Sequence, residues 1–530
     1  MPSVLEKPVV TADEAAALIQ DGQTVAIGGS GAGHSIPERM LEALGRRFRA
    51  CGRPRGLVLV HPFGVGNQKD RGLEHMAFPE MYRRIIGGHW SMSPSLPKLA
   101  AQNLFEAYCL PAGIIVQLFH AAAAGSPGWL STIGLNTFID PRVEGGKLNA
   151  VTQEDIVELV RRDGKEYLFY RTIPIHVALI RAAKADTEGN LSMDQEVAPW
   201  HNCAMAQAAR AAGGITIAQV KRVVEPRTLD PRTVRVPGIF VDYLVVDPDQ
   251  GMTYGIGFDP ALCGEARKPE SEFPPFAFSL RKVIARRAAL ELRPGAVLNV
   301  GFGIPDGVIK VAREQGIAEQ VVPTIEQGPI GGIPTEGLEF GAAYNSTAIV
   351  ETGHQFSFYH GRGVDMTFLG FAEVDAEGNV NVSKIESAII GVGGFIDISQ
   401  KARKVVFCGS LAVRGKFELE RGILRAVRHG QPKFVERVRQ ITFSGRYATA
   451  TGQEVLYVTE AAVFRLAAGG VQLVEIAPGL DFERDILPQM GFRPKLAEPL
   501  LTMAPELFAE DLLPRTLFRQ FSEGGGEATG

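Results

Sequence analysis

Three short markers occur in the same order in both halves of the chain, and this internal repeat limits the possible folds more than any other feature. The markers lie at residues 22–29 and 295–301, at 185–191 and 374–380, and at 212–217 and 401–407. The second marker, for example, reads Asp-Thr-Glu-Gly-Asn in one half and Asp-Ala-Glu-Gly-Asn in the other. Self-similarity of this kind is typical of a duplicated structural unit. We therefore expect two similarly folded halves fused in one chain.

The spacing of the markers indicates that the first half carries a large insertion. The second and third markers are 28 residues apart in the first half (Gly189 to Ile217) and 27 in the second (Gly378 to Val405). The first and second markers, in contrast, are 167 residues apart in the first half and 83 in the second. The extra residues therefore lie between the first and second markers.

A segment rich in charge and proline, residues 263–276, separates the two copies and predicts the domain boundary. We expect a first domain over residues 1–262, the linker 263–276 and a second domain over 277–521. The tail 522–530 contains three consecutive glycines and is expected to be disordered.

Strand-like and helix-like patterns alternate in both halves. Residues 58–60 and 321–325 are short β-branched runs, whereas the apolar residues within 40–48 and 308–312 recur at helical spacing. Such alternation is typical of α/β domains. The expected fold is therefore two open α/β domains, each with a mostly parallel sheet covered by helices.

Composition excludes several classes of protein. Lys and Arg total 55 and Asp and Glu total 59, so the net charge of −4 argues against a nucleic-acid or membrane-surface partner. The most apolar stretch, 113–125, is too short to span a bilayer, and residues 1–10 do not resemble a secretory signal. The five cysteines form no C-x-x-C pair, so we expect buried free thiols and no metal site. These features predict a soluble, cytoplasmic protein.

Three glycine-rich turns follow apolar runs, at residues 28–33, 301–305 and 391–395. Glycine allows the backbone to approach a ligand closely, and a helix that begins after the turn offers free N–H groups to an anion. The dinucleotide fingerprint fails, because His34 and Asp306 occupy the position of its third glycine in the first two turns. Taken singly, each turn is more simply explained as a tight turn than as a phosphate site.

A carboxylate at the end of a predicted strand is the strongest catalytic candidate. Glu326 follows the run 321–325 and is itself followed by glycines and prolines through Pro334. In parallel sheets, ligands bind beyond the carboxyl ends of the strands. From the residues alone, a solvated turn residue or a helix cap is the favoured interpretation of Glu326.

The segment 326–334 (Glu-Gln-Gly-Pro-Ile-Gly-Gly-Ile-Pro) resembles the catalytic segment of family I coenzyme A transferases, of the acetate, propionate and 3-oxoacid branch. Residues 87–90, 137–142 and 145–149 resemble first-half signatures of the same branch. The turns 301–305 and 391–395 resemble its CoA-contacting loop and its oxyanion glycines. The resemblance covers nearly the whole chain.

The resemblance implies a ping-pong transfer of CoA between short-chain carboxylic acids through a glutamyl-CoA thioester on Glu326. It also implies oxyanion donors at Gly393 and Gly394, an acyl group facing the turn 28–33, and a homo-oligomer. The residues implied to line the CoA path are Gly301, Phe302, Gly303, Ile304 and Pro305. With an ordinary pKa of about 4.3 the glutamate is ionised at neutral pH, so no base is expected to activate it. The resemblance also implies that CoA is a substrate and that no cofactor is permanently bound.

Two other classes of function remain open at this point. A thioester hydrolase on the same fold would use an ordered water in place of the acceptor acid. A non-catalytic acyl-CoA-binding protein would keep the fold without the chemistry.

Overall fold

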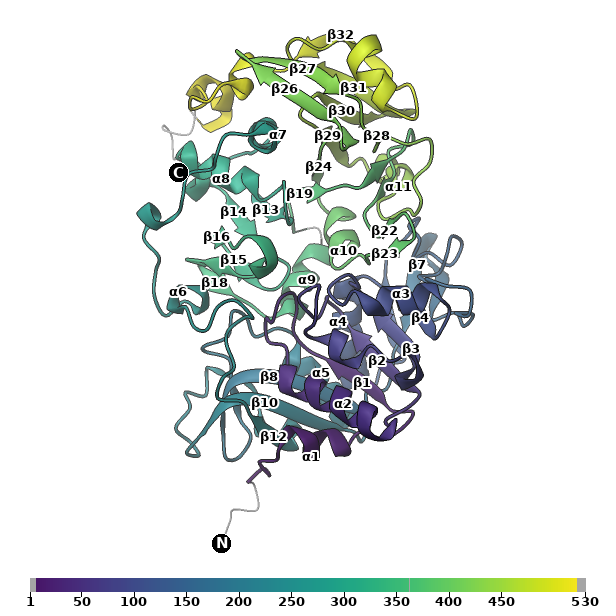
Figure 1. Ribbon diagram of the computed structural model, residues 1–530, viewed down its shortest axis with the longest axis vertical. Coiled ribbons are helices and arrows are strands. Elements are labelled where there is room, and N and C mark those ends of the chain that lie inside the picture. The colour runs from purple at the N-terminus through teal and green to yellow at the C-terminus, as the bar shows by residue number, and fades with distance from the viewer. Residues whose placement is uncertain (1–5, 362, 522–530) are drawn as a thin grey trace.

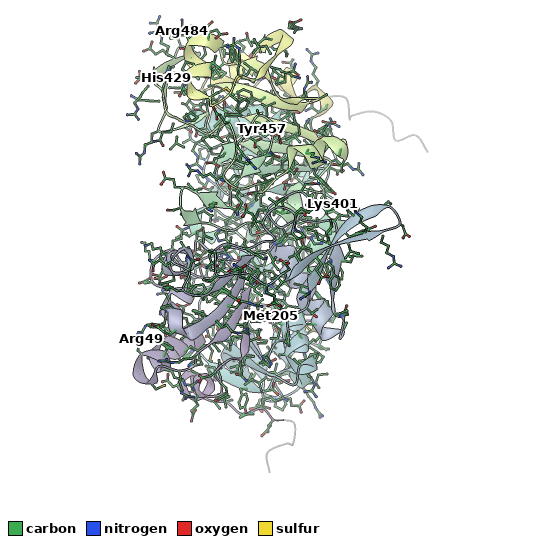
Figure 2. The ribbon with its side chains drawn as sticks, turned by 90° about the vertical axis from the view of Figure 1, so that its right-hand side faces the viewer. Arg49, Met205, Lys401, His429, Tyr457 and Arg484 are labelled. Atoms are coloured by element: carbon green, nitrogen blue, oxygen red, sulfur yellow. The ribbon has the colours of Figure 1, made fainter. Side chains whose placement is uncertain are left out.

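The computed structural model describes residues 6–361 and 363–521. Two large sheets follow each other along the chain and form two bodies stacked along the long axis (Figure 1). Figure 2 shows Arg49 and Met205 in the lower body and Tyr457 and Arg484 in the upper one. The domain limits predicted above stay a prediction, whereas the α/β class with largely parallel sheets is confirmed.

The first sheet has nine strands in the order β11-β9-β8-β1-β2-β3-β4, with β10 paired to β8 and β12 to β10. Pairing is parallel except at β9 and β11. The strands are β1 Thr24–Ile27, β2 Leu57–His61, β3 Tyr82–Gly87, β4 Glu106–Cys109, β8 Val177–Asp186, β9 Leu191–Ser192, β10 Ile215–Val224, β11 Val234–Val236 and β12 Tyr243–Val246.

The second sheet has ten strands in the order β18-β15-β14-β13-β19-β24-β29-β30-β31-β32. The central five, β14 to β29, are parallel. The strands are β13 Val297–Val300, β14 Val322–Thr324, β15 Pro329–Ile330, β18 Ala348–Ile349, β19 Met366–Gly370, β24 Lys404–Cys408, β29 Glu454–Val458, β30 Ala462–Ala467, β31 Gly470–Ile476 and β32 Lys495–Thr502.

The two sheets share one central topology. The parallel order β2-β1-β8-β10-β12 of the first half corresponds to β14-β13-β19-β24-β29 of the second. The three sequence markers fall at equivalent places, namely the strands β1 and β13, the turns 186–190 (after β8) and 375–379 (after β20, Glu373–Val374), and the strands β10 and β24. The prediction of two similarly folded halves is therefore confirmed.

The turns 186–190 and 375–379, which carry the second marker, show how closely the copies agree. The carboxylate of Asp186 accepts hydrogen bonds from the backbone and side chain of Asn190, and Asp375 accepts the same pair from Asn379. The intervening glycines, Gly189 and Gly378, have positive φ values of 83° and 80°. This left-handed conformation explains why both markers contain glycine before asparagine.

Eleven α-helices in the described residues accompany the sheets. They are α1 Ala12–Ala17, α2 Glu38–Cys51, α3 Ser95–Ala101, α4 Ala112–Ala123, α5 Asn202–Ala211, α6 Pro260–Cys263, α7 Leu280–Ala289, α8 Gly307–Glu314, α9 Thr352–His360, α10 Phe395–Ser399 and α11 Gly445–Ala450. The predicted apolar faces of α2 and α8 are buried, as the helical spacing indicates. None of the described helices has the length and apolar character that crossing a membrane requires.

Helices α5 and α10 occupy equivalent places but begin differently. Trp200, with φ of 57°, and His201 precede α5, whereas Gly393, with φ of 51°, and Gly394 precede α10. Trp200 is fully buried. The same backbone bend is thus filled by an indole ring in the first half and left open by glycines in the second.

The predicted insertion lies between β2 and β8 and contacts the other half. It contains β3, β4, α3, α4 and a small sheet of β5 Gly128–Ser131, β6 Val157–Arg162 and β7 Lys165–Arg171. Its loop around Phe138 donates a backbone hydrogen bond of 2.8 Å to Ile441 O. Gln440 Nε2 donates to Glu144 in return, at 2.7 Å. The insertion therefore helps to fix one half against the other.

Candidate active site between the two halves

Glu326 lies just beyond the carboxyl end of β14, in a turn that requires glycine. The Gly328 amide donates to Ile325 O at 3.0 Å, and the Ile325 amide donates to Pro329 O at 3.0 Å. Gly328 has φ of 132°, and a Cβ there would stand 2.2 Å from Val350 O. Gly328 is thus needed to close the turn that directs the Glu326 side chain into the site.

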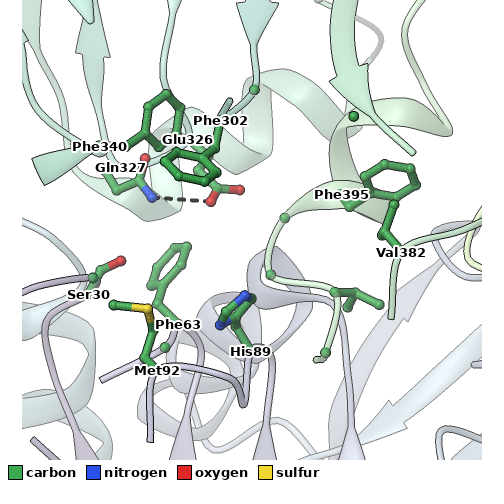
Figure 3. Close-up of a pocket in the computed structure, with 18 of the residues that line it drawn as sticks. Ser30, Phe63, His89, Met92, Phe302, Glu326, Gln327, Phe340, Val382 and Phe395 are labelled. Carbon is green, nitrogen blue, oxygen red and sulfur yellow. Dashed lines mark hydrogen bonds between the residues drawn. The ribbon is translucent and has the colours of Figure 1, made fainter. Parts of the chain in front are cut away.

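A cavity of about 430 Å³ opens in front of Glu326, between the two halves. Ser30, Phe63, His89 and Met92 reach it from the first half (Figure 3). Phe302, Gln327, Phe340, Val382 and Phe395 reach it from the second half. Among the described residues that line it, Glu326 is the one acid and none is lysine or arginine. The cavity is therefore largely apolar around a single carboxyl group.

The electrostatic state of Glu326 differs from the one expected from the sequence. The residue is half-buried and keeps one face open to the cavity, but protein atoms surround its carboxyl group. This desolvation raises the pKa of Glu326 to about 8, and the charge of Asp397 adds to the rise. Hydrogen bonds from the Gly394 amide and from Gln327 Nε2, the latter at 3.1 Å, oppose it. The expectation of an ordinary, ionised glutamate at neutral pH is therefore wrong.

The glycine turn before α10 stands directly against Glu326. A Cβ on Gly394 would lie 1.7 Å from Glu326 Oε2, so any side chain at this position would displace the Glu326 carboxyl group. The Gly394 amide faces the same carboxyl group. The Gly394 amide is therefore a hydrogen-bond donor held directly against the Glu326 carboxyl group.

Gly393 does not fit the oxyanion role that the sequence predicts for it. Its amide already donates to Gly88 O at 2.9 Å, and the Val392 amide donates to the same oxygen at 2.8 Å. On its other side, Gly393 O accepts a 2.8 Å hydrogen bond from Ala112 N at the start of α4. Gly393 is thus occupied in anchoring the turn.

The first-half segment 87–90 holds this turn in place. Besides the two bonds to Gly88 O, Trp90 N donates to Ile390 O at 2.8 Å. A Cβ on Gly88 would lie 1.9 Å from Pro62 O, which explains the glycine there. The segment that carries part of the sequence resemblance therefore supports the catalytic turn from the opposite half.

The predicted CoA loop reaches the cavity only in part. Gly301 and Phe302 line it, and the Phe302 ring packs edge-on against Phe340 with centroids 5.7 Å apart. Gly303, Ile304 and Pro305 do not line the cavity; Pro305 O instead accepts from Val308 N at the start of α8. In the turn 28–33, Ser30 and Gly31 line the cavity.

The sequence analysis assigned no individual role to several cavity residues, and the sequence patterns that could have indicated them differ. Gln327 is adjacent to Glu326, so a side-chain donor beside the carboxyl group was available from the motif itself. Burial lowers the pKa of His89 to about 4, so this ring is uncharged at neutral pH. Phe63 and Met92 carry no motif, and only the tertiary structure brings them to the site.

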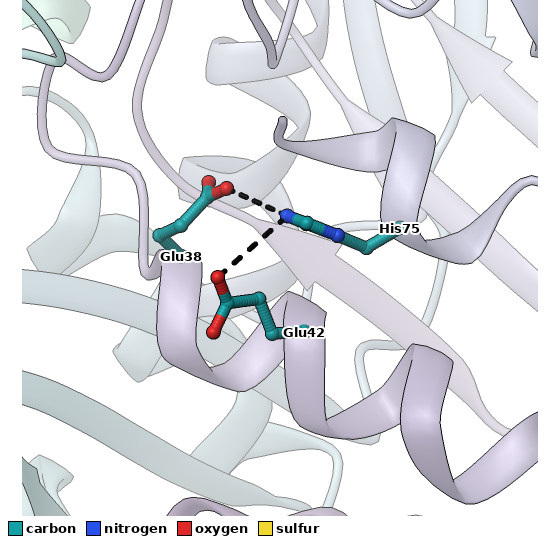
Figure 4. A group of neighbouring side chains, drawn as sticks. All are labelled: Glu38, Glu42 and His75. Carbon is teal, nitrogen blue, oxygen red and sulfur yellow. Dashed lines mark hydrogen bonds and ion pairs between the residues drawn. The ribbon is translucent and has the colours of Figure 1, made fainter. Parts of the chain in front are cut away.

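A group of metal-ligand residue types lies away from the cavity (Figure 4). His75 Nε2 lies 2.8 Å from a Glu38 carboxylate oxygen and 4.0 Å from one of Glu42. Glu38 also accepts from Tyr254 and from the Gly72 amide, and Glu42 pairs with Arg39. Hydrogen bonds and ion pairs therefore already account for this group.

The cysteines are free, but only Cys109 and Cys408 are buried. Cys51 is exposed, and Cys203 and Cys263 are partly exposed. The expectation of buried thiols is thus correct for two of the five.

A duplicated α/β fold with one carboxyl group and one glycine turn in an apolar cavity between its halves is the arrangement that the comparisons with known proteins assign to a family of CoA-transferring enzymes. The Coenzyme A transferase family model matches residues 9–247. Acetate CoA-transferase YdiF of Escherichia coli K12 is 43% identical over 506 residues, which cover 95% of each chain. Caffeate CoA-transferase of Acetobacterium woodii is 40% identical, covering 94% of this chain and 97% of its own.

A solved structure agrees along the whole chain. The acyl-CoA transferase YdiF of E. coli O157:H7, in a thioester complex with CoA, superimposes with a TM-score of 0.91 at 42% identity. The match covers 96% of this chain and 97% of that one. The chain belongs to the coenzyme A transferase family, and it is a CoA-transferase.

Proposed function

We propose that Glu326 is the nucleophile that carries CoA between two carboxylic acids. The observation that carries the proposal is its place in an apolar interdomain cavity, against the Gly394 amide. The family's chemistry requires a carboxylate that can itself become the temporary acyl partner, and Glu326 is the one acid among the described lining residues.

The steps balance without any further reactant. A Glu326 carboxylate oxygen attacks the thioester carbonyl of the donor, the C–S bond breaks, and CoA leaves as the thiolate. The thiolate then attacks the glutamyl carbonyl of the mixed anhydride, releases the donor acid and leaves a glutamyl-CoA thioester. An acceptor carboxylate reverses both steps. The Gly394 amide stabilises the oxyanion, a contribution worth roughly 10²–10³ in rate.

We infer that the substrates are small monocarboxylic acids. A second carboxylate on the acyl chain would enter a cavity whose described lining offers no lysine or arginine to pair with it, and burying an unpaired charge is costly. The relatives named for acetate and caffeate, both monocarboxylates, agree with this inference. Gly301 and Phe302 would border the CoA path, while Phe63, His89 and Met92 would face the acyl group.

The remaining expectations are part of the same proposal. The enzyme uses CoA as substrate without a resident cofactor, acts in the cytoplasm and forms a homo-oligomer. Sedimentation well above the 57.2 kDa of one chain would support the last point. The comparisons favour transfer over both alternatives, hydrolysis and non-catalytic binding, and the loss of acyl-CoA with and without added acetate separates transfer from hydrolysis.

A mass measurement tests the central step. Incubated with an acyl-CoA and no acceptor, the protein should gain the mass of CoA on Glu326, and borohydride should reduce this thioester and inactivate the enzyme. Glu326→Gln should form no adduct. Glu326→Asp, with a shorter reach, should keep roughly 1% of the activity or less. A Glu326→Gln enzyme that still exchanged CoA at a substantial rate would rule out the covalent mechanism.

A further inference from the structure

Three helices pack against one another close to Glu326. They are α4 of the first half and α9 and α10 of the second. Asp397 of α10 lies at the junction with a fully buried side chain. Burial of a carboxylate is costly unless hydrogen bonds or charges compensate it, so its partners show what the position is built for.

Asp397 has one partner on each of the two other helices. His360 Nε2, at the end of α9, lies 2.8 Å from Oδ1, and Gly113 N, in the first turn of α4, donates to Oδ2 at 3.1 Å. Among the described residues, His360 is its ion-pair partner. Tyr170, which the Asp397 charge also influences, has its pKa raised well above the usual value by burial and is therefore neutral.

The junction is built to a close fit. A Cβ on Gly113 would stand 2.6 Å from Asp397 Oδ1 and 2.5 Å from the ring of Phe356. On the same edge of this ring, the neighbouring atom Cε1 lies 3.1 Å from where a Cβ of Gly394 would be, beside Glu326. The carboxyl groups of Asp397 and Glu326 therefore both lie near one edge of the Phe356 ring.

The N-terminus of α4 also connects the junction to the catalytic turn. Its first two amides reach across to the second half, Ala112 N to Gly393 O and Gly113 N to Asp397. Both acceptors flank Gly394. Any movement of Asp397 relative to α4 would consequently move the amide that faces Glu326.

We propose that Asp397 is a positioning residue that fixes the Gly394 turn and whose charge destabilises the Glu326 carboxylate relative to its uncharged thioester. The proposal rests on Glu326 being the nucleophile. Forming glutamyl-CoA removes the Glu326 charge, so the repulsion from Asp397 disappears in the intermediate. The repulsion between Asp397 and Glu326 thereby shifts the equilibrium of the first half-reaction towards the glutamyl-CoA thioester.

The test is the ratio of glutamyl-CoA to free enzyme at a fixed ratio of acyl-CoA to free acid, quantified by intact mass. At pH 9, where Glu326 is ionised, Asp397→Asn should lower this ratio about tenfold, the change that one pKa unit represents. At pH 6, where Glu326 is protonated and uncharged, the variant and the wild type should agree within about twofold. His354→Gln on the exposed side of α9 is the matched control and should leave the ratio unchanged at both pH values.

A second variant tests the same inference in case Asp397→Asn does not fold. His360→Lys keeps Asp397 and replaces its imidazole partner by an ammonium group that stays charged at pH 9, so it should lower the ratio at pH 9 in the same way. A loss that is equal at pH 6 and pH 9, or no loss in either variant, would overturn the inference. Failure of the nucleophile assignment is distinguishable, because wild-type enzyme would then form no adduct at all.

Discussion

The carboxyl group of Glu326 shows how strongly a fold can alter a side chain that looks ordinary in the sequence. Glutamate in water has a pKa of about 4.3, yet burial and the nearby charge of Asp397 raise it to about 8 here. A nucleophile with a raised pKa is more basic, and so more reactive once ionised. The disadvantage is that most of the resting enzyme holds a proton at neutral pH.

The pH dependence of the first half-reaction follows from this shift. Only the carboxylate attacks, so kcat/KM for the acyl-CoA should rise about tenfold per pH unit below the pKa and level off above about 8. Stopped-flow or single-turnover rates between pH 5.5 and 9 measure the profile. A rate that is flat from pH 5.5 upwards would show that Glu326 titrates like a solvated glutamate.

The same shift has a signature in stability. The pKa of Glu326 is higher in the folded state than in the unfolded state. Its contribution to the free energy of unfolding is therefore fully present below about pH 4.3 and is lost as the pH rises through about 8. Glu326→Gln carries no charge in either state. Its Tm relative to wild type should therefore increase between pH 5 and pH 9, which thermal melts at both pH values would detect.

The glycine turn before α10 is the element whose proposed role is most directly testable. Gly394→Ala would place a methyl group where Glu326 Oε2 now lies. We expect kcat to fall by roughly 10² or more, since displacements near 1 Å cost about that much. The melting temperature should change little, because Gly394 has a negative φ of −90° that alanine accepts.

Gly370 is the matched control for this variant. It also lines the cavity, but a Cβ there would meet no atom within 4 Å. Gly370→Ala should keep activity within a few-fold of wild type. Equal activity of the two alanine variants would argue against a role for the Gly394 turn in the reaction.

The elements of this fold were largely predictable, and the partners of the site were not. Local patterns sufficed for β2, β14, α2 and α8, because alternation and helical spacing are properties of short segments. The occupied amide of Gly393 was not predictable, since its acceptor, Gly88 O, lies about 300 residues away in the sequence. The role of His360 was missed for the same reason: its partner Asp397 is on another helix.

The two halves form one catalytic unit because each supplies what the other lacks. The second half carries Glu326 and Gly394, and the first half supplies Gly88 O and Ala112 N, which hold the turn. We expect a chain divided within residues 263–276 to be active only when both fragments are present. Co-expression of the fragments, followed by CoA-transfer and adduct assays, tests this expectation and the predicted domain boundary together.

The fragment carrying residues 277–530 is the informative one when it is expressed alone. It should be folded by circular dichroism and yet form no glutamyl-CoA, because its turn lacks the anchors from the first half. Adduct formation by this fragment at a rate close to that of the intact chain would contradict the shared-site arrangement.

The buried Trp200, at the place that Gly393 occupies in the other copy, has a consequence for how such a protein diversifies. With its own turn filled by an indole ring, the first copy has no open counterpart of the Gly394 turn, and it lines the cavity with a wall that includes Phe63, His89 and Met92. Changes in that wall can alter which acid is accepted without disturbing the nucleophile. A duplicated fold in which one turn is filled thus places the two tasks in different halves, so that the accepted acid and the reactivity can change independently.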